Sequence, residues 1–161
     1  MSEASFPITE AHWPENRIVV ETLFREYIAS LSEDISFQNP DDELAGLPGK
    51  YARPGGVVLI AWDGAEAAGA IAYRMLEPGV AEMKRLYVRP AFRGCGLGRE
   101  LAEELIANAR QCGYRTMLLD TLASMASARA LYRDLGFAPV EAYYDNPLTG
   151  VMYMALELND L

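Results

Sequence analysis

Hydrophobic positions near the start of the chain repeat with the spacing of an amphipathic helix. This pattern predicts a helix over about 16–31, packed by one face. The next stretch, 36–56, reads SFQNPDDELAGLPGKYARPGG and is rich in Pro, Gly and Asp. It predicts a long connection with a short helix around 41–47. Long connections in compact domains are often functional, so this one is expected to border a ligand site.

From residue 57 the hydrophobic pattern becomes typical of strands. Strands are expected at 57–62, 67–76, 80–88, 116–121, 137–144 and 151–158, separated by turn residues such as Asp63-Gly64. Helices are expected after the glycine-rich turn, from about 97, and over 124–135, where Gly136 would end the helix. This order predicts a single domain over 1–161 of the α/β or α+β class, with a mixed sheet flanked by helices.

Composition narrows the possible functions. A net charge of −9 argues against nucleic acid as a partner, and no apolar run is long enough for a membrane span. No export signal is visible, and two cysteines form no disulfide framework, so a reducing cytoplasm is the expected compartment. The lone His12 argues against a metal site and against a catalytic triad built on histidine.

Positive charge gathers around one glycine-rich turn. Residues 84–99 hold five of the 14 Lys and Arg residues and no acid. The turn, RGCGLG at 93–98, lacks the Lys-Ser/Thr of a P-loop and the glycine spacing of a dinucleotide-binding fingerprint. Glycines between a strand and a helix allow main-chain N–H groups to face an oxyanion, so a pyrophosphate suits the site. The alternative is a tight turn that only needs glycine for its backbone angles.

Two motifs resemble the GNAT superfamily of N-acetyltransferases. The segment MKRLYVRPAFRGCGLGRELAEELIANAR, at 83–110, looks like its acetyl-CoA-binding segment, with the pattern Arg/Gln-x-x-Gly-x-Gly/Ala. The segment SARALYRDLGF, at 127–137, is similar to its second signature, Ala-x-x-Leu-Tyr-x-x-x-Gly-Phe. The resemblance covers nearly the whole chain. It implies a central mixed sheet of about six or seven strands, with acetyl-CoA in a cleft at the central strands and no metal.

The resemblance also implies roles for the residues of the first motif. Main-chain groups of Leu86, Tyr87 and Val88 would bind the pantetheine arm of acetyl-CoA along the strand edge. The pyrophosphate would lie on the amides of the turn, and the charges of the two arginines would assist. The turn residues are Arg93, Gly94, Cys95, Gly96, Leu97, Gly98 and Arg99. Cys95 occupies a variable position, and direct acetyl transfer needs no enzyme nucleophile.

Acetyl transfer to an amine needs a proton acceptor and a proton donor. The resemblance implies that Tyr132 points its hydroxyl at the sulfur of coenzyme A, so Tyr132 is the candidate acid. The alternative is that Tyr132 only fills space in the core. Glu82 is the candidate base, directly or through water. Strand alternation places it on one face with Lys84, Leu86 and Val88 unless a bulge intervenes. Alternatively, Glu82 is a solvated strand residue or the partner of an arginine.

The acceptor is expected between the N-terminal helices and the C-terminal strands, near Phe37, Tyr143 and Asp145. Aromatic rings and a carboxylate would hold a cationic amine, although Asp145 also fits an ordinary turn. The expected acceptor is a small-molecule amine or a peptide amino group, and a homodimer is compatible with the sequence.

Met125 stands where many GNAT members have an asparagine that contacts the cofactor. This departure leaves open an acyl-CoA-binding or regulatory module that has lost acetyl transfer. A third possibility is an unrelated nucleotide-binding domain.

Overall fold

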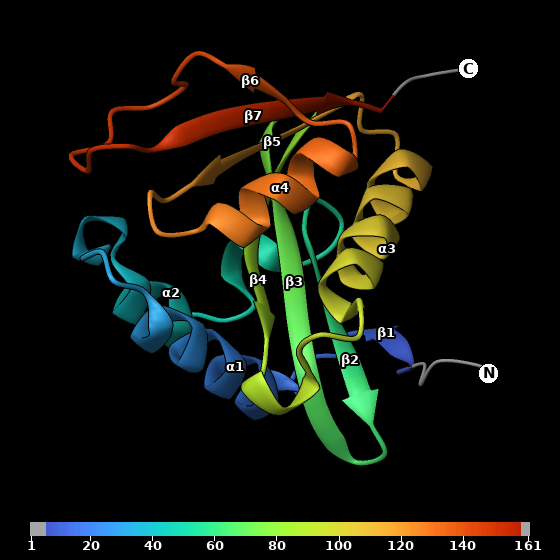
Figure 1. The fold of residues 1–161 in the computed structure, drawn as a ribbon. Coiled ribbons are helices and arrows are strands. Elements are labelled where there is room, and N and C mark those ends of the chain that lie inside the picture. Colours follow the sequence, from blue (N-terminus) through green and yellow to red (C-terminus); the bar gives the residue numbers. More distant parts are fainter. Residues whose placement is uncertain (1–5, 159–161) are drawn as a thin grey trace.

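A computed structural model describes residues 6–158, which form seven strands and four α-helices (Figure 1). The strands are β1 (Ile8–Glu10), β2 (Val57–Asp63), β3 (Glu66–Glu77), β4 (Val80–Val88), β5 (Thr116–Thr121), β6 (Ala138–Val140) and β7 (Met152–Glu157). The helices are α1 (Arg17–Ser30), α2 (Pro40–Ala45), α3 (Leu97–Gln111) and α4 (Ala126–Asp134). No helix of residues 6–158 is long and apolar enough to cross a bilayer.

All seven strands belong to one sheet, in the order β1-β2-β3-β4-β5-β7-β6. Every pairing is antiparallel except that of β4 with β5. Helix α3 lies between β4 and β5 in the sequence and supplies the crossover connection that a parallel pair requires. The expected mixed α/β sheet flanked by helices is therefore confirmed, with seven strands.

Two apolar clusters hold the layers together. One joins the sheet to α3, whose buried stripe includes Leu97, Leu101 and Leu105, and to Tyr132 of α4. The other joins the sheet to α1 and α2 through Leu23, Phe24 and Leu44 among other residues. The stripes on α1 and α3 have the helical spacing that the sequence predicted.

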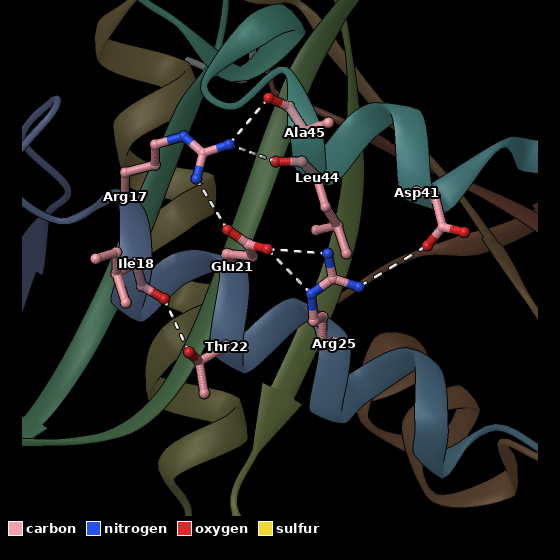
Figure 2. A network of polar contacts seen from close by, with 8 residues as sticks. All are labelled: Arg17, Ile18, Glu21, Thr22, Arg25, Asp41, Leu44 and Ala45. Carbon is pink, nitrogen blue, oxygen red and sulfur yellow. Dashed lines mark hydrogen bonds and ion pairs between the residues drawn. The ribbon is translucent and has the colours of Figure 1, made fainter.

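An ionic network attaches α2 to α1 (Figure 2). Arg17 donates hydrogen bonds to the carbonyls of Leu44 and Ala45, at distances of 3.0 and 2.9 Å, and so satisfies acceptors that the end of α2 leaves free. Glu21 accepts hydrogen bonds from both Arg17 and Arg25. The connection between α1 and β2 is thereby attached to α1.

A bulge interrupts β4. Arg85 and Leu86 together oppose the single residue Ile71 of β3, and Arg85 has a positive φ of 64°. An extra residue reverses the alternation of the strand. Met83 before the bulge and Leu86 after it therefore contact the same apolar cluster. The expectation that Glu82 shares a face with Lys84, Leu86 and Val88 is corrected: it holds for Lys84 only.

The two central strands separate after Glu82, before β4 reaches the bulge. β4 pairs with β5 only over Val80–Glu82, opposite Thr116–Leu118. The second half of β4 has β3 on one side and no neighbouring strand on the other. The sheet is thus open at its centre, and the open edge belongs to the strand that leads into the glycine turn.

Two strand predictions need correction. β1 was not predicted, because its three residues are too short to show a period. The strand expected over 137–144 is reduced to Ala138–Val140, an exposed edge strand that contains Pro139. Tyr143 and Tyr144 beyond it form a ring cluster with Tyr153 of β7, with ring centroids 5.3–5.5 Å apart.

Candidate active site

The glycine turn lies between β4 and α3, as expected. Gly94 and Gly96 have φ angles of 86° and 87°, and no atom lies within 4 Å of where a Cβ would stand on either residue. The main-chain N–H groups of residues 94–99 donate no hydrogen bond to any residue of the described chain. The N-terminus of α3 and the turn before it therefore present several free donors, a geometry that suits an anion.

The two arginines of the turn are engaged with the protein. Arg93 donates from Nε to the Val88 carbonyl at 2.8 Å, and its guanidinium lies over the ring of Tyr87. Arg99 is partly exposed and pairs with Asp134 at 3.2 Å and with Glu103 at 3.6 Å. The thiol of Cys95 donates to the Phe92 carbonyl. Positive charge at this site thus comes mainly from the helix end, with both guanidinium groups nearby.

A groove of about 260 Å³ follows the open edge of β4. Its lining includes Leu86, Tyr87, Val88 and Arg93 from β4 and the turn, Tyr27 and Leu31 from the region of α1, and Ser124 and Met125 from the segment before α4. The three strand residues expected to contact a pantetheine arm therefore line one groove that leads away from the turn. Met125 lies in its wall and begins α4 without a side-chain cap.

A narrow cavity of about 30 Å³ continues the groove into the gap between β4 and β5. It shares Tyr27, Leu31, Leu86 and Met125 with the groove, and Tyr132 lines it. Among the described residues, the Tyr132 hydroxyl has no hydrogen-bond partner. Burial raises the pKa of Tyr132, and the nearby Tyr27 and Asp120 raise it further. Tyr132 is therefore a protonated donor at neutral pH.

A wider pocket of about 350 Å³ opens on the far side of the narrow cavity. Phe37, Tyr143 and Asp145, the residues expected near an acceptor, all line it together with Glu82. Lys84 and Gln38 line both the wide pocket and the narrow cavity. The structure thus brings the four expected residues together, with Tyr132 in the adjoining cavity.

Glu82 is buried and fully engaged. Its Oε1 accepts from Arg74 Nε at 2.9 Å, and its Oε2 accepts from the Tyr143 hydroxyl at 2.7 Å. Burial acts to raise the pKa of Glu82, but the charge of Lys84, the Tyr143 hydrogen bond and Arg74 outweigh it and lower the pKa. The carboxylate is therefore ionised at neutral pH and is a weaker base than an ordinary glutamate.

Sequence reasoning missed two features of the site. Arg85 is buried at the bulge and makes a bidentate ion pair with Glu43 of α2, at 3.0 and 3.1 Å. No local pattern could have indicated a pair that lies 42 residues apart in the chain. The second feature is Lys84, which lines both the narrow cavity and the wide pocket. Its place beside Glu82 on the same strand was the available signal.

No group of three or more His, Cys, Asp or Glu side chains suited to a metal ion occurs in residues 6–158. The hollows contain carboxylate, phenol, amide and ammonium groups. Such groups can bind an organic ligand and move protons.

Comparison with known proteins gives one consistent result. The sequence profile of the acetyltransferase (GNAT) family matches residues 15–137. An uncharacterised N-acetyltransferase of Schizosaccharomyces pombe is 40% identical, over 99% of this chain and 99% of the relative. A crystal structure of a putative acyl-CoA N-acyltransferase from Klebsiella pneumoniae is 27% identical, with a TM-score of 0.74 over 95% of this chain and 97% of the other.

A putative acetyltransferase from Salmonella typhimurium, whose structure was solved with its cofactor acetyl-CoA, has the same fold. Its TM-score is 0.76 at 21% identity, over 98% of this chain and 96% of the other. Together, the profile match over most of the chain, the end-to-end relative and the shared fold show that the chain belongs to the GNAT family of acetyltransferases.

Proposed function

We propose that this protein transfers the acetyl group of acetyl-CoA to a primary amine, a small molecule or a peptide amino group, by direct attack of the amine on the thioester. The observation that carries the proposal is the row of free main-chain N–H groups at 94–99, which adjoins a groove and a cavity containing an available phenol. The single sheet that runs through the described residues supports one domain over 1–161.

The turn and the open edge of β4 are the proposed cofactor site. The pyrophosphate of acetyl-CoA would lie on the amides of residues 94–99, and its pantetheine arm would follow the main chain of Leu86, Tyr87 and Val88. Open space above Gly94 and Gly96 supports this, because the backbone there can approach a ligand closely. Met125 would supply apolar contact in the groove where other members have an amide.

Tyr132 is the proposed general acid. Acetyl-CoA supplies an activated thioester, and transfer leaves a thiolate that must gain a proton or a hydrogen bond. A phenol that stays protonated at neutral pH and has a free hydroxyl in the cavity can supply either.

Glu82 is the proposed general base, acting through a water molecule. Each of its oxygens already accepts one hydrogen bond, from Arg74 and from Tyr143, and a water molecule on a remaining lone pair could relay the proton without breaking either contact. A carboxylate with a lowered pKa takes up a proton less readily, and the nearby cations Lys84 and Arg74 instead favour the neutral form of an incoming amine.

A thiol-release assay with acetyl-CoA tests the function. The acceptors are amino acids, polyamines, aminoglycosides and short peptides, and calorimetry measures the affinity for CoA. Release with at least one class supports the proposal. Tight CoA binding without release from any amine would instead support a catalytically silent acyl-CoA-binding module, and binding of ATP without CoA would support a nucleotide-binding domain.

Replacing Gly96 by alanine should weaken CoA binding by roughly tenfold, since a side chain at positive φ costs about 1–3 kcal/mol and shifts the turn. Calorimetry measures this change. Gly113→Ala is the matched control, because Gly113 has a similar φ of 91° and open space but lies after α3, away from the site. Equal loss of affinity in both variants would contradict the assignment of the turn.

Replacing Glu82 by glutamine is expected to lower kcat about tenfold and to leave the Kd of CoA unchanged, because a weak base contributes less to the rate than a well-matched one. Steady-state kinetics on the best acceptor measure the effect. Glu141→Gln, at an exposed position, serves as the comparison. A Glu82→Gln enzyme with wild-type kcat would remove the base role.

A further inference from the structure

Lys84 is a cation at the centre of the site, and the charges of the Glu82 and Asp120 carboxylates act on it without direct contact. Among the described residues, its ammonium forms no ion pair and no hydrogen bond, whereas Lys50, the other lysine of the chain, pairs with Glu43 at 3.1 Å. Burial lowers the pKa of Lys84, and the Glu82 carboxylate opposes that effect. An unpaired, partly buried ammonium is unfavourable in the free protein, so a ligand anion there would gain binding energy.

The wide pocket has further unused capacity to bind an anion. Arg74 uses Nε to hold Glu82, and its terminal nitrogens form no hydrogen bond to the described residues. The Glu82 carboxylate acts on Lys84 through its charge, but its two hydrogen bonds go to Arg74 and Tyr143, and no ion pair joins it to Lys84 among the described residues. Three cations thus line the pocket: Lys50 is paired with Glu43, whereas Lys84 and Arg74 keep free donors, and Lys84 also lines the reaction cavity.

Negative charge and aromatic rings lie elsewhere in the same pocket. Asp145 is exposed and has no ion pair or hydrogen bond among the described residues, and Phe37, Tyr143 and Tyr144 supply ring faces and edges. An acceptor with one anionic end and one amine would be complemented at both ends. A simple amine or a polyamine would leave Lys84 unpaired and would meet its charge.

Resting on the proposed function, we infer that the acceptor is an amine that carries a carboxylate close to the reacting nitrogen, as an α-amino acid does, and that Lys84 binds the carboxylate with help from Arg74. The closeness follows from Lys84 lining both the cavity that contains Tyr132 and the wide pocket. An anion on its ammonium can lie only a few atoms from a nitrogen aimed at the thioester.

The test compares alanine, methionine and phenylalanine with their amides. Amidation removes the carboxylate charge and lowers the pKa of the amine, so reactivity alone would favour the amides. For at least one pair, kcat/KM is expected to be at least about tenfold higher for the acid, because a charge-assisted hydrogen bond to the carboxylate is stronger than one to a neutral amide. Amides that react as well as the acids would overturn the inference and leave the proposed function intact.

Substitutions of Lys84 then test whether this residue binds the carboxylate of the acceptor. Lys84→Met should remove the preference for the acid, and Lys84→Arg should keep most of it. Arg133→Met, the control at an exposed cation that lines none of the groove, the narrow cavity and the wide pocket, should keep the preference as well. Unchanged CoA affinity and thermal melting show that a variant is folded. A Lys84→Met enzyme that keeps the full preference would overturn the assignment.

A second measurement separates failure of catalysis from failure of the inference. If no amine releases thiol, calorimetry of the CoA-loaded protein with each acid and its amide still decides. Binding of an acid at least about tenfold tighter than its amide, lost in Lys84→Met, supports the carboxylate site, and equal or absent binding of both overturns it.

Discussion

Tyr132→Phe is expected to lower kcat roughly 10²–10⁴-fold, the range in which a positioned general acid contributes to a rate. The phenol lines the narrow cavity, and its hydroxyl has no partner among the described residues, so its removal breaks no hydrogen bond of the fold. The ring would keep its edge contact with Phe137. Binding of CoA, which relies on the turn and on β4, should change little. Stopped assays of thiol release on the best acceptor give kcat.

Tyr73→Phe is the control variant, because Tyr73 is also a buried tyrosine but lines none of the groove, the narrow cavity and the wide pocket. It removes the hydroxyl that donates to Asn108 Oδ1 at 2.7 Å, a bond worth about 1 kcal/mol of stability. Its kcat should stay within about twofold of wild type, since no reacting group is touched. Equal losses of kcat in the two variants would show that packing, rather than proton donation, explains the effect of Tyr132.

Glu43→Gln is expected to destabilise the fold by about 3 kcal/mol at neutral pH, because it leaves the Arg85 guanidinium buried without its counter-charge. Both side chains are at least 90% buried, and Glu43 also accepts from Tyr51 and Lys50. Urea unfolding followed by circular dichroism measures the change. Glu21→Gln, in the more exposed network of α1, should destabilise the fold much less, because solvent screens that network.

The stability difference between wild type and Glu43→Gln should depend on pH. Burial acts to raise the pKa of Glu43, but Arg85 and Lys50 outweigh it and hold the pKa at about 2, below its ordinary value of 4.5. A depressed pKa contributes stability above the unfolded value and loses it as the carboxylate is protonated. The difference should therefore be constant above pH 4.5 and shrink as the pH falls toward about 2. A difference that grows on acidification would contradict this pairing.

The fold was predictable where its elements are long and periodic. The stripe of α3 and the runs of β2, β3 and β4 bury the residues that their spacing indicated. Short edge elements were not predictable, since β1 and β6 have three residues each and depend on their neighbours. The aromatic residues 143 and 144 looked like part of a strand, but their rings pack on Tyr153 from a loop.

The site was predictable through its motifs and less so through its electrostatics. The motifs located the glycine turn and Tyr132, and the chain places Glu82 beside Phe37, Tyr143 and Asp145. The bulge at Arg85 depends on Glu43 from a distant helix, so the face of each β4 residue could not be read from alternation. The roles of these residues in catalysis and binding stay predictions.

Only three residue pairs join β4 to β5, so main-chain hydrogen bonding across the middle of the molecule is sparse. Cohesion between the two halves of the sheet comes mainly from side chains packed under α3 and α4. The two halves of the sheet are thus hydrogen-bonded to each other only near one end, at Val80–Glu82. A ligand bound between the two halves would add contacts across the gap and make local opening less frequent. Amide hydrogen exchange along residues 83–88 should therefore slow when the ligand is bound.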